Sequence, residues 1–171
     1  MEIILKKMGK LIINSYSELE QYDGQELGLS DYHMITQDQI NKFADATLDY
    51  QWIHLDAEKA KSESPYEKTT AHGFLTLSIL PYLWNQIIEV NNIKMLVNYG
   101  IEKLRFNQPV LVNGEVRLKA KLNSLINLRG IAKAEIKVTL EIKDSKKPAL
   151  DALLIFLYHL NEGAKSHGLV S

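Results

Sequence analysis

The segment from Phe74 to Val90 constrains the fold most, because it predicts a helix that is apolar on every side. One face repeats apolar residues at three- and four-residue steps, and Leu75, Ile79 and Leu83 make the opposite face apolar as well. A helix of this kind is buried. Pro81 lacks a backbone N–H and should bend the helix axis. The rest of the chain must therefore cover the apolar faces of this helix.

The second half of the chain predicts strands that can provide this cover. Apolar and polar residues alternate strictly over residues 132–143 and again over 116–122, which indicates strands with one wet face. Residues 96–106 predict a weaker strand. Residues 149–160 are apolar on both faces, so we expect a central strand or one whose outer face lies in a subunit interface. A long buried helix followed by antiparallel strands predicts an α+β fold, most simply a sheet wrapped around the helix.

The first half predicts shorter helices separated by loops. Ser17 and Glu20 have capping-box spacing and should begin a helix that ends near residues 23–24. Thr36 and Gln39 repeat that spacing and should begin a second helix. Its apolar stripe comprises Ile40, Phe43, Ala44 and Thr47. The loop-rich stretch that follows predicts one helical turn from Asp56. Loops of this kind often carry functional groups.

Composition excludes several classes of protein. The 171 residues predict one domain, with its core at about 20–160, a short N-terminal extension and a polar C-terminal tail. The absence of cysteine excludes disulfides, thiolate metal sites and a cysteine nucleophile. A net charge of −1 argues against nucleic-acid binding. Lys6, Lys7 and Lys10 interrupt any signal-peptide core, and no stretch approaches a membrane span. We expect a cytoplasmic protein.

Asp49 and His54 form the first candidate site. Five helical steps would set them about 140° apart, so a continuous helix would not pair them. A turn after the second helix could bring both into one pocket, where a carboxylate beside an imidazole can activate water. The spacing alone favours structural roles for both. We expect three further histidines to be structural or exposed. They are His33, His159 and His167.

His72 and Gly73 form the second candidate site, because they stand directly before the buried helix. The free N–H groups of a first helical turn suit a developing oxyanion, and glycine lets a carbonyl approach the backbone. An ordinary glycine near a helix start is the simpler interpretation of this pair alone. The sequence has no HExxH, no G-x-S-x-G and no dinucleotide or P-loop glycine pattern. We therefore expect no metal, including a zinc ion on His54 and His72, and no cofactor.

Three blocks, taken together, carry a resemblance to a known family. They are FADATLDYQWIHLDAEKA, TAHGFLTLSILP and NYGIEKLRFNQPV, in that order. The chain resembles the MaoC-like dehydratases, in particular the branch named after nodulation protein N, over roughly residues 20–160. This resemblance implies a hot-dog fold, usually dimeric, and the (R)-specific hydration of 2-enoyl thioesters carried by coenzyme A or acyl carrier protein.

The resemblance also assigns roles to residues. Asp49 and His54 would be the catalytic pair, with Asp49 accepting the proton of water and His54 orienting that water and helping to deliver a proton at C2. Gly73 would offer its backbone N–H to the thioester carbonyl, and we expect Gln51 and His72 to contact substrate as well. The family often has Asn-Pro where this chain has Gln51-Trp52, which affects substrate preference.

Two other functions fit the same residues. An acyl-thioester hydrolase would use Asp49 to direct water at the carbonyl carbon, and it would release free thiol. A non-catalytic module that binds an acyl chain or a protein partner would tolerate Asp49→Asn without loss of function.

Overall fold

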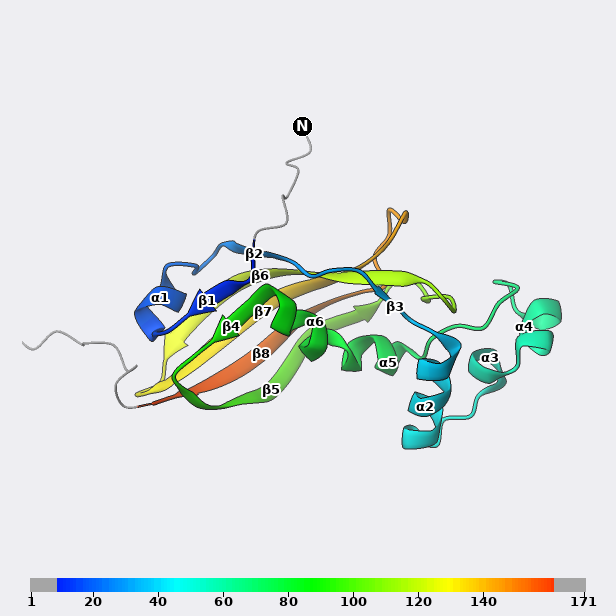
Figure 1. The fold of residues 1–171 in the computed structure, drawn as a ribbon, viewed down its shortest axis with the longest axis horizontal. Coiled ribbons are helices and arrows are strands. Elements are labelled where there is room, and N and C mark those ends of the chain that lie inside the picture. Colours follow the sequence, from blue (N-terminus) through cyan, green and yellow to red (C-terminus); the bar gives the residue numbers. More distant parts are fainter. Residues whose placement is uncertain (1–8, 162–171) are drawn as a thin grey trace, which may run out of the picture.

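The structure, a computed structural model, describes residues 9–161, where a curved antiparallel sheet packs against a helix (Figure 1). The sheet order is β2-β6-β7-β8-β5, with β3 also paired to β6. Its strands are β2 (Glu26–Leu29), β3 (His33–Met34), β5 (Ile93–Phe106), β6 (Glu115–Asn127), β7 (Ile131–Ile142) and β8 (Leu150–Leu160). The predicted α+β class is confirmed. Lys6, Lys7 and His167 lie outside the described residues.

The predicted central helix consists of two parts, α5 (Gly73–Ser78) and α6 (Leu80–Ile87). The break falls at Ile79, directly before the first turn of α6, where Pro81 stands. Backbone hydrogen bonds from Ile79 N to Leu75 O and from Leu83 N to Ile79 O carry the chain across it. Pro81 has no N–H to contribute there, and the single helix that the sequence predicted is divided at Ile79.

The predicted helix is wrong over its last three residues. Ile88–Val90 form β4, which pairs in parallel with β1 (Leu11–Ile13). Helical periodicity over residues 84–90 cannot reveal this pairing, because the partner strand lies more than seventy residues away in the sequence.

The core lies between the sheet and the central helix. Alternating residues of β6 and β7 face inward as predicted, including Val116, Leu118, Ala120, Leu122, Ala132, Ala134, Ile136, Val138 and Leu140, all at most 1% exposed. Leu83 and Trp84 meet them from α6. The opposite side of the helix is open, and Phe74 and Tyr82 are 65% and 56% exposed there. The prediction that the central helix is buried on every side is therefore wrong for the single chain.

The first half forms helices at one end of the sheet (Figure 1). They are α2 (Gln37–Thr47), α3 (Trp52–Leu55) and α4 (Ala57–Glu63), while α1 (Tyr16–Glu20) lies at the other end. Thr36 caps α2 through the N–H of Gln39, as its spacing predicted. The hydroxyl of Ser15, not Ser17, caps α1. Asp56 caps α4, and α3 was not predicted.

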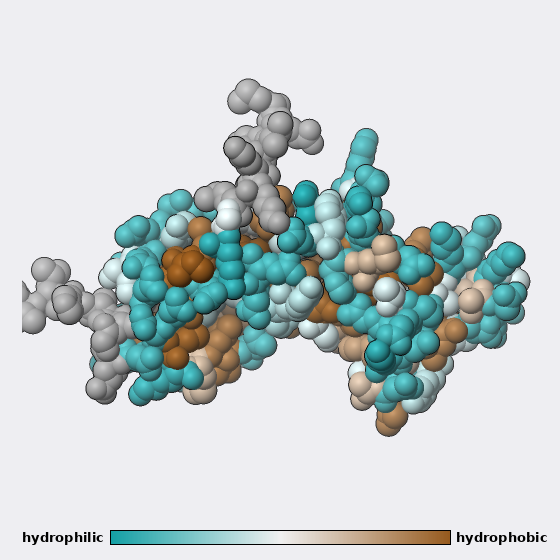
Figure 2. All heavy atoms as spheres, viewed as in Figure 1, coloured by the Kyte–Doolittle hydropathy of each residue, from teal (hydrophilic) through white to brown (hydrophobic). Residues whose placement is uncertain are grey.

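The surface is mainly hydrophilic. Hydrophilic residues cover most of the face in Figure 2, and hydrophobic residues reach the surface in separate places. Within residues 9–161 no helix is both long and apolar enough to span a membrane.

Candidate active site

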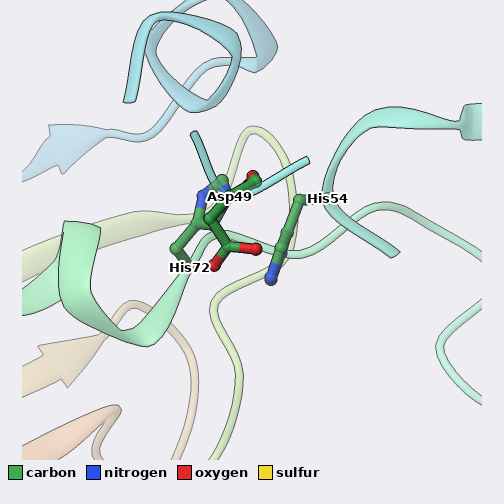
Figure 3. A group of neighbouring side chains, drawn as sticks. All are labelled: Asp49, His54 and His72. Carbon is green, nitrogen blue, oxygen red and sulfur yellow. The ribbon is translucent and has the colours of Figure 1, made fainter. Parts of the chain in front are cut away.

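Three side chains from separate segments meet at the end of the sheet where α2 and α3 lie. They are Asp49, two residues beyond α2, His54 on α3, and His72 at the start of α5, and one donor atom of each lies within 4.8 Å of the others. In Figure 3 the Asp49 carboxylate and a ring nitrogen of His54 point toward the same space. The structure thus brings together the two residues that the spacing placed across a turn.

An unusual backbone conformation ends α2 directly before Asp49. Leu48 ends α2 with φ 61° and ψ 23°, in the left-handed region. This conformation costs a non-glycine residue about 1 kcal/mol, so surrounding contacts must maintain it. Gln51 then begins the single turn of α3 that carries His54. Because Asp49 lies outside both helices and His54 on α3, the two are not fixed on one continuous helix and can face each other.

The hydrogen bonds of His54 define its tautomer. Its Nδ1 lies 2.7 Å from the carbonyl oxygen of Thr70, and a carbonyl can only accept, so Nδ1 carries the hydrogen. The Nε2 of the neutral ring is therefore an acceptor with a free lone pair. Burial lowers the pKa of His54 below its usual value of 6.5, with smaller contributions from its neighbours. At neutral pH the ring is a base ready to take a proton at Nε2.

The backbone of His54 is held as firmly as its ring. Gln37 donates from Nε2 to the carbonyl oxygen of His54 at 2.8 Å, and its Oε1 accepts from the hydroxyl of Thr69 at 2.6 Å. The N–H of Thr70 donates to Ile53. Sequence reasoning missed Gln37 and Thr70, because a helix-start glutamine and a backbone carbonyl leave no pattern that marks them as part of a site.

His72 lies behind this pair. It is 2% exposed, its ring stacks on that of His54 with centroids 3.8 Å apart, and Phe43 packs against it. Its Nε2 lies 3.0 Å from the backbone oxygen of Asp49. The ring therefore lies against both Asp49 and His54. A direct contact of His72 with substrate stays a prediction.

A cavity of about 470 Å³ opens beside His54. Gln51 and Gly73, both predicted to contact substrate, lie on its wall with His54. The Phe106 ring of β5 also forms part of the wall, and sequence reasoning did not single it out. Asp49 lies beside the cavity and is exposed. The cavity wall thus combines apolar and polar side chains with the imidazole of His54 and the backbone of Gly73.

The geometry of the two histidine rings does not suit a shared metal ion. The rings stack with their planes inclined by 30° and centroids 3.8 Å apart, so the planes meet well beyond the ring edges. A zinc ion lies close to the plane of each imidazole that binds it, about 2 Å from the nitrogen. One ion cannot satisfy both rings here. Asp49, His54 and His72 are therefore better suited to acid–base chemistry.

Comparison with known proteins places the chain in a family. The family model described as "MaoC like domain" matches residues 19–143. This protein belongs to the MaoC-like family. Its catalogued relatives include 3-hydroxyacyl-thioester dehydratase Z of Mycobacterium tuberculosis, 42% identical over 84% of this chain and 95% of the relative. Nodulation protein N of Rhizobium meliloti is 38% identical over 86% of this chain and 92% of the relative, which supports the predicted branch.

Solved structures share the fold of this MaoC-like chain. R-hydratase PhaJ1 from Pseudomonas aeruginosa superposes with a TM-score of 0.66 over 86% of each chain, at 20% sequence identity. The hot-dog fold that the resemblance implied is thereby confirmed.

Proposed function

We propose that this MaoC-like protein adds water to 2-enoyl thioesters, giving (R)-3-hydroxyacyl thioesters, and catalyses the reverse dehydration. The observation that carries the proposal is the unpaired Nε2 of His54, a residue of the cavity wall, with the Asp49 carboxylate beside it. The 42% identity to a protein named 3-hydroxyacyl-thioester dehydratase supports the same substrate class. Coenzyme A or acyl carrier protein as the carrier, and a cytoplasmic location, belong to this proposal.

The tautomer of His54 gives it the role of base. Water bound between His54 and Asp49 donates one hydrogen to Nε2 and the other to the carboxylate. As its oxygen attacks C3, the proton passes to Nε2 and electrons move to the thioester oxygen. The resulting imidazolium is a good acid because burial lowers the pKa of His54, and it returns the proton to C2. The resemblance implied that Asp49 accepts the proton of water; this proposal gives that proton to His54 and keeps the delivery of a proton at C2 with His54.

Gly73 stabilises the charge that forms on the thioester oxygen. Its N–H belongs to the first turn of α5, where N–H groups have no acceptor within the helix, and the residue lies on the cavity wall with His54. A donor that is already in place when the enolate forms lowers the barrier without reorganisation.

The deciding experiment follows the ultraviolet absorbance of crotonyl-CoA together with the appearance of free thiol. Hydration removes the conjugated absorbance and releases no thiol, which is the expected result. Thiol release from saturated acyl-CoA would identify a hydrolase instead. The absence of reaction with every enoyl thioester would indicate a non-catalytic binding module. Oxidation of the product by an (S)-specific dehydrogenase would contradict the (R) configuration.

The pH dependence of hydration should follow His54. Only the neutral ring accepts a proton, so kcat/KM should stay level at neutral pH and fall as acid protonates the free enzyme. Because burial lowers the pKa of His54, that fall should begin below the ordinary value of 6.5. Initial rates between about pH 5 and 8 check this. An acid limb centred above 6.5 would assign the base to another group.

Gly73→Ala should reduce hydration about tenfold or more, roughly 1.4 kcal/mol of transition-state stabilisation. The added methyl would lie 3.3 Å from the Phe106 ring, on the wall where the thioester binds. The melting temperature should change little, since Phe106 is 46% exposed and can shift. Phe106→Leu, alone and combined with Gly73→Ala, controls for displacement of the ring. A stable Gly73→Ala protein with full activity would place the carbonyl elsewhere.

We also propose a homodimer, now on the basis of β5. The strand predicted at residues 149–160 is β8, and its neighbours β7 and β5 make it an interior strand, one of the two positions expected for it. At the edge, β5 pairs with β8 on one side and exposes Met95, Leu96, Tyr99 and Ile101. A long apolar edge strand invites pairing with another chain. Sedimentation at micromolar concentration should give a dimer that Tyr99→Glu weakens; a wild-type monomer would contradict this.

A further inference from the structure

The Asp49 carboxylate must be held in place, yet its own segment does little to hold it. Asp49 is exposed, and it follows Leu48, whose left-handed backbone is strained. The chain between α2 and α3 is short and lies at the surface. An external contact is therefore needed to fix the carboxylate relative to His54.

His72 makes that contact. The backbone oxygen of Asp49 lies 3.0 Å from Nε2 of His72, and because a carbonyl only accepts, Nε2 carries the hydrogen and donates it. The ring is 2% exposed, and Phe43 packs against it, so it has little freedom to move. A rigid donor thus holds the backbone of an exposed carboxylate.

The same ring supports His54. The two imidazoles stack at 3.8 Å, and the adjacent Thr70 carbonyl accepts from Nδ1 of His54. The segment that carries Thr70 and His72 is itself fixed, since the N–H of Ala71 donates to Val110 and that of Thr76 donates to His72. One short, anchored segment therefore sets both members of the pair.

The remaining nitrogen of His72 argues against a purely space-filling role. With the hydrogen on Nε2, Nδ1 is an acceptor, and among the described residues it is buried without a partner. An unpaired buried acceptor destabilises a fold, whereas a phenyl ring would fill the same space without that cost. The compensating interaction is the Nε2–H donated to Asp49.

We propose that His72 is a positioning residue, whose Nε2–H holds Asp49 in register with His54 for the addition of water. The inference rests on the proposed hydration, and it moves His72 from the substrate contacts to the support of the catalytic pair. A small displacement of a reacting group lowers the rate of the chemical step more than it lowers binding.

Two substitutions separate positioning from packing. His72→Phe keeps a ring against His54 but loses the donor, and it should lower kcat about ten- to a hundredfold with little change in KM. His72→Gln loses the ring but places an amide N–H near the position of Nε2, and it should retain kcat within about threefold of wild type. A space-filling role predicts the opposite order. Equal or higher kcat in His72→Phe than in His72→Gln would overturn the proposal.

A measurement on the wild-type protein does not depend on folding of the variants or on activity. Nitrogen NMR of the His72 side chain should show a hydrogen on Nε2 that is donated to the Asp49 carbonyl. A ring with its hydrogen on Nδ1 alone would overturn the proposal whatever reaction the protein catalyses. If crotonyl-CoA is not hydrated but the Nε2–H form is observed, the proposed function fails and the contact with Asp49 stands.

Discussion

His54→Ala and Asp49→Asn should each lower kcat for hydration at least about a hundredfold, the low end of the range for general acid–base groups. The alanine variant has no nitrogen to take the proton from water. The asparagine variant keeps the size of the exposed Asp49 side chain but loses the charge that orients water and favours the imidazolium. Both rates are measured by loss of the enoyl absorbance under substrate saturation.

His33→Ala is the matched control for these variants. His33 lies in β3, where its Nε2 contacts Gln39 and its ring meets Tyr82 edge-on, and it is not part of the cavity wall. Its removal should leave kcat within about twofold. All three proteins should unfold cooperatively. Near-wild-type hydration by either His54→Ala or Asp49→Asn would remove the proposed mechanism.

Leu83→Ala should destabilise the fold by about 2–5 kcal/mol, the largest expected effect on stability. Leu83 is fully buried on α6 against the inner face of the sheet, so its truncation leaves a cavity that the surrounding strands cannot close. A loss of about 3 kcal/mol corresponds to a melting temperature roughly 6–12 °C lower in a domain of this size.

Leu128→Ala makes the same chemical change at the surface. Leu128 is 48% exposed in the hairpin between β6 and β7, and its backbone bond to Ile131 does not depend on the side chain. Its truncation should change stability by less than about 0.5 kcal/mol. Equal melting temperatures for the two variants would show that the sheet does not enclose α6 as described.

The sequence by itself determined the features that depend on local periodicity and capping. Strict alternation over 132–143 predicted β7 and its inward face, and the apolar run predicted helical structure over residues 73–87. Thr36 marked the start of α2 through its own side chain. These signals survive in the fold because each comes from neighbouring residues whose environment does not depend on distant segments.

Tertiary structure alone decided how those parts meet. Residues 88–90 form a strand because β1 is available as a partner, and the sheet places β5 at its edge beside β8. At the site, the Thr70 carbonyl fixes the tautomer of His54, and the His72 ring contacts the backbone oxygen of Asp49. Contacts between segments about twenty residues apart produce no periodic pattern in the sequence. The sequence could therefore single out Asp49 and His54, but only the fold shows how their side chains are oriented.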